Sequence, residues 1–441
     1  MSPQEMSNAM YGLQSMSATH EEVRDLLRCL SKRIKQSSEG LDGQGVGSAL
    51  YGLRRMSSCY PEVREIVLVL SDKIRQCTER ISSRSVGNAL YGMQKFTSYH
   101  PEVRTLLSVL VGHVSASPGA LESQHISSAL YGMQGMCSSH SEVRDMLVAL
   151  APKIFQCSDA LRPAEIGAAF YGLQGMSSEY PEVRVVLQAL SSKMQSCDEP
   201  LGSQAIGIAV YGLQRMSSHY PEVRDVLGLL ASRIRTDLSL LPPQTLSQCL
   251  YGLQGMSAQH VAVSMFLSSA LEKVPSNVQE YVTCEVTGQS LWGYEGAMDL
   301  WRSVDLFLHG VKDIPENVKC RLVEILREVS TLTIKETRGV CQVKHSQSNT
   351  QDLFLREIQS FVNDCGLDAK VTSNIYIHGF EADILLTSGD GRVINIEIDG
   401  PTHQYPRSNL FDTVRDRYLS EAHGVRIYRV NLAKIFYGSN V

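Results

Sequence analysis

Hydrophobic residues recur with helical spacing through most of the chain. In residues 161–200, Ile166, Phe170, Leu173 and Met176 are separated by four, three and three residues. This spacing produces the apolar stripe of an amphipathic helix. The first half of this segment therefore predicts a helix.

A second helix is predicted after the polar residues 177–180. Pro181 suits the first helical position, where no backbone N–H is needed, and Glu182 is favourable beside the positive end of the helix dipole. The apolar stripe continues with spacings of four, three and four residues at Val183, Leu187, Leu190 and Met194. The segment is thus a helix–turn–helix unit.

This unit repeats every 40 residues. Each copy contains Tyr-Gly, which begins at Tyr11, Tyr51, Tyr91, Tyr131, Tyr171, Tyr211 and Tyr251. A period of this size is typical of stacked supersecondary units that cannot bury their apolar faces alone. We expect residues 1–310 to form an all-α solenoid. It contains seven helix pairs and then a degenerate eighth first helix at 286–296, where Trp292-Gly293 replaces Tyr-Gly.

Equivalent positions of the aligned repeats are here called columns, and several columns favour a structural function. One column contains His20, Tyr60, His100, His140, Tyr180, Tyr220 and His260. Exchange of His for Tyr fits an aromatic packing position better than a metal site. A second column contains Arg24, Arg64, Arg104, Arg144, Arg184 and Arg224. We expect these arginines to pair with acids of neighbouring repeats rather than to contact phosphates.

Three columns differ strongly between copies. The first contains Glu5, Gly45, Ser85, His125, Glu165, Ala205 and Thr245. The second contains Asn8, Ser48, Asn88, Ser128, Ala168, Ile208 and Gln248. The third contains Ser15, Arg55, Lys95, Gly135, Gly175, Arg215 and Gly255. Their spacing places all three on one helical face together with the invariant glycine of Tyr-Gly.

A glycine inside a helix costs up to about 1 kcal/mol relative to alanine, so something must approach the backbone there. One explanation is close packing of the neighbouring helix. The other is a ligand strand that crosses successive glycines, with one element bound per repeat. This second layout is that of repeat proteins that recognise one RNA base with two or three side chains per unit.

The hydrophobic period changes in the last hundred residues. Residues 351–362 predict a helix, and 370–377, 382–387 and 393–398 predict strands; a helix at 411–423 and a strand at 426–430 follow. We therefore expect a small α/β domain over 351–441, joined to the solenoid by a helical cap and polar linker over 311–350.

Acidic residues are concentrated in this domain on two predicted strands. Asp383 lies on one strand, Glu397 and Asp399 point to the same side of the next, and His403 follows. Asp383 and Glu397 are candidate ligands of Mg²⁺, which would generate a nucleophilic water for phosphodiester cleavage with Asp399 and His403 as further catalytic candidates. Acids at strand ends also commonly form turns and caps, so both interpretations stand.

Four segments of this domain resemble the RAP domain. They are residues 382–386, 396–403, 415–419 and 424–430, and the string Glu-Ile-Asp-Gly-Pro-Thr-His at 397–403 is the most specific of them. The 40-residue units resemble octotricopeptide repeats, whose typical sequence motif is present at 204–213. The combination implies an RNA-binding protein of RNA processing, stability or translation in mitochondria or chloroplasts.

The resemblance also implies a restriction-endonuclease-like fold for residues 351–441. In active members of that wider class, a lysine lies two residues after the second metal-binding acid. Asp399 occupies this position here. An added carboxylate cannot supply the positive charge that stabilises the attacked phosphate, so an RNA endonuclease remains an alternative function.

Composition and charge narrow the function classes. The chain has 441 residues and a net charge of −5, which weakens a nucleic-acid interpretation based on bulk charge and leaves a protein-binding solenoid as another alternative. Its 11 cysteines form no CxxC pair, as expected in a reducing compartment. No membrane span or transit peptide is visible. We expect a monomer whose partners are single-stranded RNA and organellar ribonucleoprotein components.

Overall fold

The computed structural model describes residues 1–276, 300, 303–308, 310–311, 313–337, 349–377, 380–399, 416, 419–420 and 424–431. The chain divides into two compact units. The first contains residues 1–277 and 310–322, and the second contains 278–309 and 323–441. The predicted degenerate repeat at 286–296 lies outside the described residues. Within them, no helix is long and apolar enough to cross a membrane.

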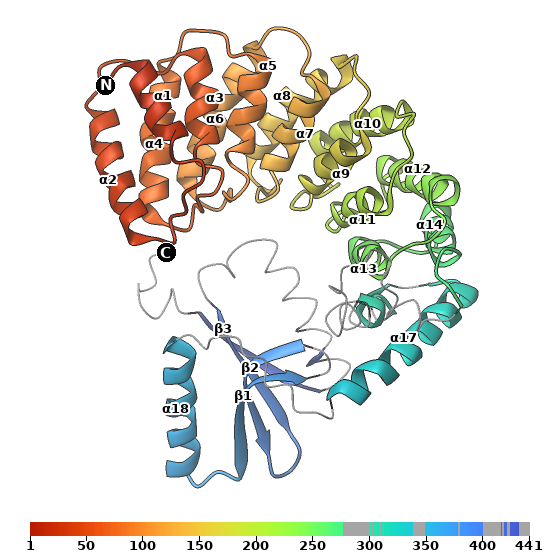
Figure 1. Ribbon diagram of the computed structural model, residues 1–441. Helices are drawn as coiled ribbons and strands as arrows, with labels where there is room; N and C mark the ends of the chain where they lie inside the picture. Colours follow the sequence, from red (N-terminus) through yellow and green to blue (C-terminus); the bar gives the residue numbers. More distant parts are fainter. Residues whose placement is uncertain are drawn as a thin grey trace. The chain divides into compact units, whose positions relative to one another are not determined.

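The first unit is a solenoid of seven helix pairs, as predicted (Figure 1). The first helices of the pairs, here called A helices, are α1 (Pro3–Tyr11), α3 (Gly43–Tyr51), α5 (Ser83–Tyr91), α7 (Ser123–Gly132), α9 (Pro163–Tyr171), α11 (Ser203–Tyr211) and α13 (Pro243–Gly252). The second helices, here called B helices, are α2 (Glu21–Lys35), α4 (Pro61–Arg75), α6 (Pro101–Ala116), α8 (Ser141–Gln156), α10 (Pro181–Gln195), α12 (Pro221–Asp237) and α14 (Val261–Leu271).

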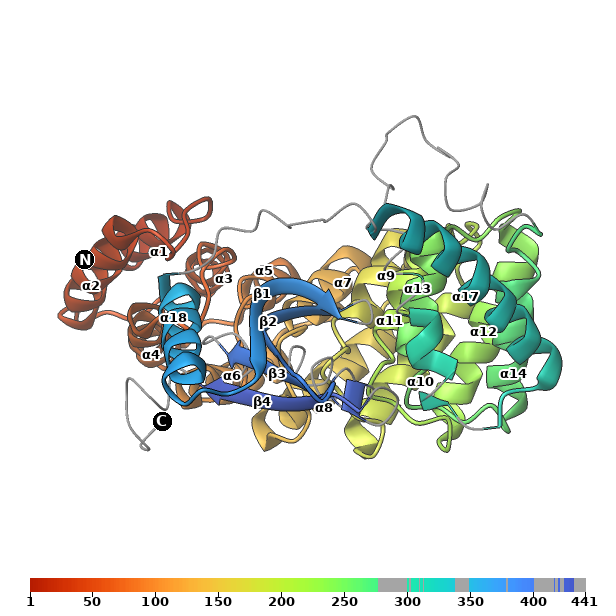
Figure 2. The same ribbon diagram turned by 90° about the horizontal axis from the view of Figure 1, so that it is seen from below.

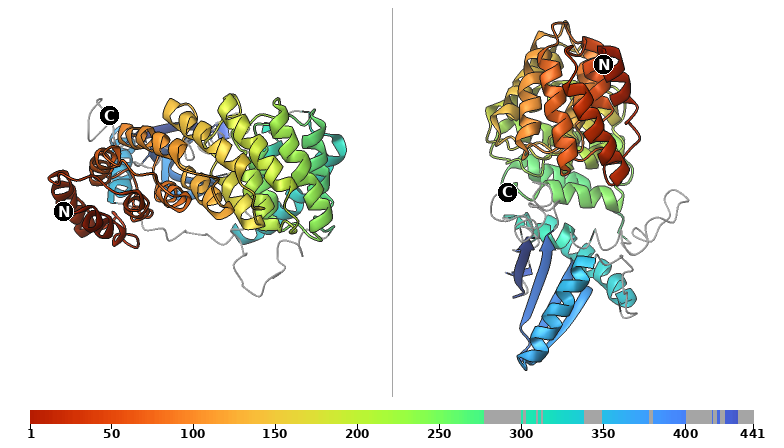
Figure 3. Two further views of the ribbon diagram at one scale, coloured as in Figure 1. Left: turned by 90° about the horizontal axis from the view of Figure 1, so that it is seen from above. Right: turned by 90° about the vertical axis from the view of Figure 1, so that its left-hand side faces the viewer.

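The two kinds of helix form two layers. Each A helix packs against the next A helix, and each B helix packs against the next B helix. Figure 2 and Figure 3 show this row of helices from below and from above. In Figure 1, α9, α11 and α13 line the inner side of the curve, and α10, α12 and α14 line its outer side.

Local sequence explains where several of the helices begin. The Asp42 and Ser82 side chains cap α3 and α5 by accepting hydrogen bonds from the N–H groups of Gly45 and Ser85, at 2.5 and 3.1 Å. Four B helices begin with proline at the first position, at Pro61, Pro101, Pro181 and Pro221. The predicted proline-initiated second helix is therefore confirmed.

The invariant glycine forms the junction between successive A helices. A Cβ atom added to Gly92 would lie 2.0 Å from the carbonyl oxygen of Leu50 in the preceding repeat. At Gly52, Gly132, Gly172, Gly212 and Gly252 the corresponding distance is 1.9–2.1 Å. Only glycine permits this approach of two backbones. Of the two explanations for the glycine, close packing is confirmed, and the expectation of an open notch for a ligand is wrong at these six positions.

Polar columns bind each repeat to the next. The Ser58 hydroxyl, which is buried, accepts a hydrogen bond from the N–H of Thr97 at 3.1 Å. The serines at 98, 138, 178 and 218 accept equivalent bonds from residues 39 positions later, at 2.8–2.9 Å. At these five junctions the bond satisfies a buried hydroxyl and a backbone N–H of the next repeat, which favours serine at this position.

The arginine column also belongs to these junctions. Arg144 pairs with Glu182 of the next repeat at 3.7 Å, and its Nη1 donates to the carbonyl of Ser138 at 2.7 Å. Its guanidinium lies 4.8 Å from the ring centre of Tyr180. Arg64, Arg104 and Arg184 form the same inter-repeat ion pairs at 3.7–3.9 Å. The predicted arginine ladder and the aromatic packing column are thus one structure.

α17 (Glu316–Thr337) is divided between the two units after Leu322, and the second unit also contains α18 (Asn349–Asp364) and a four-stranded sheet. The strands are β1 (Ala369–Ile377), β2 (Phe380–Ser388), β3 (Val393–Asp399) and β4 (Arg426–Asn431), in that order across the sheet. β1, β2 and β3 pair antiparallel, whereas β3 and β4 pair parallel. α18 packs against β1 (Figure 3). The small α/β domain is confirmed at this level of detail.

Candidate nucleic-acid interface

Seven tyrosine rings form a continuous stack along the A helices. Consecutive ring centres are 5.3–6.0 Å apart and adjacent planes differ by 18–25°. These values are those of direct aromatic stacking, so the rings contact one another and leave no space for a base between them. Tyr11 at the end of the stack is 44% exposed and the other six rings are half-buried.

Polar side chains flank this stack on the A helices. The column seven residues before the tyrosine is exposed in every repeat and contains Gln4, Gln44, Arg84, Gln124, Ala164, Gln204 and Gln244. The column three residues before it is half-exposed from Ser48 to Gln248, and Asn8 is exposed. Residues with these spacings share one helical face, and Gln4 Nε2 donates to Asn8 Oδ1 at 2.9 Å.

We call this surface the tyrosine face. It consists of the tyrosine column, the columns seven and three residues before it, and the column four residues after it. The last of these lies in the turn that leads to the B helix, where Arg55 and Lys95 are exposed and Arg215 is half-exposed. Arg54, beside this column, stacks 4.4 Å from the ring centre of Tyr51 and donates to Gln14 at 2.9 Å.

The tyrosine face has an unbalanced charge. Its 28 positions include four cations, namely Arg55, Arg84, Lys95 and Arg215, and no aspartate or glutamate. The whole chain carries 46 acidic and 41 basic residues. The acids are therefore excluded from this surface although they predominate in the chain.

The first variable column does not belong to this surface. Six of its members, Gly45, Ser85, His125, Glu165, Ala205 and Thr245, are buried, so the expectation that they contact a ligand from solvent is wrong; only Glu5 is exposed. The reason is packing: a Cβ atom at Gly87 would lie 3.0 Å from the Cβ of His125 in the next repeat. Burial also lowers the pKa of His125.

The buried acid of this column has a capping role. Glu165 accepts a hydrogen bond from the N–H of Arg162 at 2.9 Å and pairs with its guanidinium at 2.7 Å. This is the geometry that stabilises the first turn of a helix. Glu165 therefore serves α9 rather than a bound molecule.

Sequence reasoning missed the column that contains Gln44 and Arg84. It lies one helical turn before the second variable column, and it varies less conspicuously because five of its seven members are glutamine. The spacing of four residues from a candidate contact column was the signal that could have identified it.

The two candidate metal-binding acids share one face of the sheet. Ile384 pairs with Ile396, so Asp383 and Glu397 are the next opposite positions on β2 and β3 and point to the same side. The predicted relation between these two acids is thus present. Asp399 ends β3, and its side chain and His403 lie outside the described residues.

Each of these acids is already engaged by the sheet itself. Asp383 Oδ2 accepts a hydrogen bond from the N–H of Ile398 at 2.8 Å. Glu397 is 5% exposed and accepts from Asn395 Nδ2 at 2.6 Å. Among the described residues, no three His, Cys, Asp or Glu side chains form a group that could hold a metal ion. The Mg²⁺ site at Asp383 and Glu397 therefore stays a prediction from the sequence.

An arginine lies beside this pair of acids. Arg429 on β4 is opposite Glu397 on β3, and its guanidinium binds Asp416 through two hydrogen bonds of 2.7 and 2.9 Å. Arg429 was missed because strand pairing, rather than proximity in sequence, brings it to this position.

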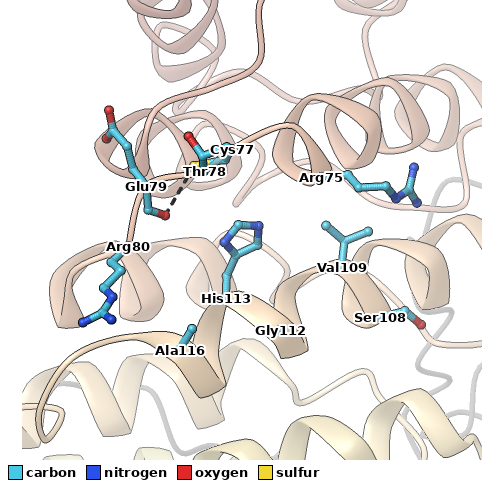
Figure 4. A pocket seen from close by; sticks show the side chains of 10 residues that line it. All are labelled: Arg75, Cys77, Thr78, Glu79, Arg80, Ser108, Val109, Gly112, His113 and Ala116. Carbon is cyan, nitrogen blue, oxygen red and sulfur yellow. Dashed lines mark hydrogen bonds between the residues drawn. The ribbon is translucent and has the colours of Figure 1, made fainter.

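A cavity of about 680 Å³ lies between α4 and α6 (Figure 4). Two of its polar groups serve the repeat junction: Glu79 accepts from the N–H of Gly43 at 3.0 Å, and His113 Nε2 bonds to the carbonyl of Ile74 at 3.0 Å. Arg75 and Arg80 point away from each other in Figure 4. These groups do not converge on one ligand position.

Neither the family models nor the curated proteins include a match to this chain. The similarity to octotricopeptide repeats and to the RAP domain therefore stays a prediction from the sequence.

Proposed function

We propose that the tyrosine face binds single-stranded RNA and that the chain acts in organellar RNA processing, stability or translation. The observation that carries this proposal is the exclusion of acids from a cation-bearing face in a chain whose net charge is −5. RNA affinity depends strongly on phosphate neutralisation by lysine and arginine. A surface without carboxylates avoids repulsion along the whole strand.

The polar residues of the face support recognition of bases. Gln, Asn and Ser side chains offer both donors and acceptors, which suits hydrogen bonding to the edges of unpaired bases. Six of the seven repeats present such side chains at corresponding positions. If one base is bound per repeat, the seven repeats would hold a strand of roughly seven nucleotides.

The C-terminal unit would complete this function by acting on the bound RNA or by recruiting organellar ribonucleoprotein components. This part of the proposal rests on the resemblance to the RAP domain. The same resemblance supports a location in mitochondria or chloroplasts, which imaging of the tagged full-length protein in cells would test.

The RNA proposal can be tested by the salt dependence of binding. The logarithm of the affinity for a single strand falls by roughly 0.7 per phosphate contact for each tenfold rise in salt, so four contacts predict a slope of roughly −3. Replacing Arg55, Arg84, Lys95 and Arg215 together by Gln should weaken binding of a mixed-sequence RNA at least tenfold at 0.1 M KCl and flatten the slope. Fluorescence anisotropy would measure both.

A matched control changes the same net charge on the other layer. Lys32, Lys35, Arg75 and Arg235 are exposed on B helices, and replacing them by Gln should leave the affinity within about twofold. Equal effects of the two variants would show that binding depends only on the net charge of the protein, which would contradict an interface on the tyrosine face. Binding that neither variant nor salt affects would favour the protein-binding solenoid.

The endonuclease alternative has one observation in its favour, the shared face of Asp383 and Glu397 on adjacent strands. Asp383→Asn tests it, because the amide oxygen can still accept from Ile398 N–H while the charge is lost. We expect RNA binding and folding to be unchanged. Mg²⁺-dependent RNA cleavage that occurs in the parent protein and disappears in this folded variant would establish the alternative.

A further inference from the structure

The fifth repeat differs from the other six on the tyrosine face. Its three variable positions there are Ala164, Ala168 and Gly175. Every other repeat has at least two side chains with hydrogen-bonding groups at the same three positions. Gln124 and Ser128 of repeat four and Gln244 and Gln248 of repeat seven are examples.

The neighbouring groups of repeat five are also withdrawn from the surface. Gln174 is 3% exposed and accepts from Gln214 at 3.5 Å. Gly175 is buried, and an added Cβ would lie 2.1 Å from the carbonyl oxygen of Met136. Tyr171 stacks between Tyr131 and Tyr211, as the tyrosines of neighbouring repeats do. A base at this repeat would meet methyl groups and a ring that is common to all repeats.

The scaffold of repeat five is nevertheless complete. Gly172 packs on the carbonyl of Leu130, Ser178 accepts from the N–H of Ser217 at 2.9 Å, and Arg184 pairs with Glu222 at 3.9 Å. Repeat five thus keeps the spacing of the array while lacking the groups that could distinguish one base from another.

We infer that repeat five is a spacer, so that the solenoid recognises RNA in two blocks of four and two bases separated by one position without base preference. This inference rests on the proposed RNA function. Methyl groups cannot tell the donor and acceptor patterns of bases apart, whereas a missing hydrogen-bond partner at the other repeats leaves a polar group unsatisfied. Because the blocks are unequal, the end of the selected RNA motif from which the neutral position lies third would reveal the direction in which the strand is bound.

The test is selection from a random single-stranded RNA library with the full-length protein, followed by affinities for RNAs changed at one position. We expect four informative positions, one neutral position and two informative positions. At the neutral position the four bases should bind within about twofold, and at its neighbours the best and worst bases should differ about tenfold.

Two variants make the assignment specific. Ala164→Gln with Ala168→Asn introduces the pair of repeat one and should create a preference of about tenfold at the neutral position. Gln124→Ala with Ser128→Ala should remove the preference at the adjacent position. All four residues are exposed or half-exposed, and thermal melting would verify that both proteins fold.

The outcomes separate the two levels of the proposal. RNA binding with preferences at seven consecutive positions, or with no preference anywhere, would overturn the spacer and keep the RNA function. So would an unchanged neutral position in the first variant when the second variant does respond. Failure to enrich or bind any RNA would overturn the RNA function together with the spacer.

Discussion

The two layers of the solenoid are built from the same repeat and carry opposite surfaces. The outward columns of the B helices include five acids, Asp25, Glu65, Asp72, Asp145 and Asp225, whereas the tyrosine face on the A helices has none. The B layer also exposes Leu68, Val148, Phe155 and Val185. Both layers belong to the same repeat scaffold, so packing of the repeats does not require this difference in surface residues. It indicates that the two layers have different binding partners.

The largest expected difference between the layers is the change in the free energy of unfolding when a glycine is replaced by alanine. Gly132→Ala places a Cβ atom 1.9 Å from the carbonyl oxygen of Leu90, so the two A helices must separate. We expect a loss of roughly 2–4 kcal/mol in the free energy of unfolding. Urea denaturation followed by circular dichroism would measure it.

The matched substitution is Gly112→Ala on the B helix α6. A Cβ atom there would have no other atom within 4 Å, so alanine should raise the free energy of unfolding by roughly 0.5–1 kcal/mol through its better helix propensity. Similar effects at both glycines would contradict the packing difference between the layers.

A single negative charge should have a smaller, layer-specific effect on RNA affinity. Gln124 and Gln188 are exposed on an A helix and a B helix, respectively. Gln124→Glu should weaken binding by about fivefold at 0.1 M KCl through repulsion of phosphates, and Gln188→Glu should change it by less than about twofold. Weakening by Gln188→Glu alone would move the interface to the B layer.

The smallest expected effect concerns pH. Burial, and next the charge of Arg104, lower the pKa of His140 below its usual value near 6.5. The unfolded chain therefore takes up the proton more readily, and the stability that neutral His140 contributes is complete above about pH 6.5 and declines as the pH falls toward the lowered folded-state value.

Other repeats supply the replacement that removes this dependence. Tyr180 occupies the same column with Arg144 over its ring at 4.8 Å. Between pH 7.5 and pH 5.5, the melting temperature of the His140→Tyr variant should therefore fall less than that of the parent protein. Identical pH profiles would show that His140 does not titrate differently on unfolding.

The fold of the solenoid was predictable because its signals are local and repeated. Proline at the start of B helices and the 40-residue period give the helix pairs directly. The sequence could not show which side of an A helix its neighbour covers. Positions 125 and 124 are adjacent in the chain, but His125 packs against the preceding A helix and Gln124 is exposed.

The C-terminal site divides in the same way. Alternation along the strands was enough to predict that Asp383 and Glu397 share one side of the sheet, and the pairing of β2 with β3 confirms this; the side shared by Glu397 and Asp399 stays a prediction. The hydrogen bond from the Ile398 N–H to Asp383 lies just beyond Ile384 and Ile396, the last backbone pair in the described ladder of β2 and β3. It forms only in this register of the two strands. Such a detail has no signature in either strand alone.

The column of buried serines has a consequence for how the array comes apart. The first and last repeats have Ala18 and Ala258 where the intervening repeats have serine. Ala258 follows the last inter-repeat bond, but Ala18 leaves the junction between repeats one and two without the hydroxyl acceptor that the next five junctions contain. In a linear array, stability is a sum over units and their interfaces. Opening should therefore start at the N-terminal repeat and travel inward, so that amide hydrogen exchange is fastest in α1 and α2 and slows toward the middle of the stack.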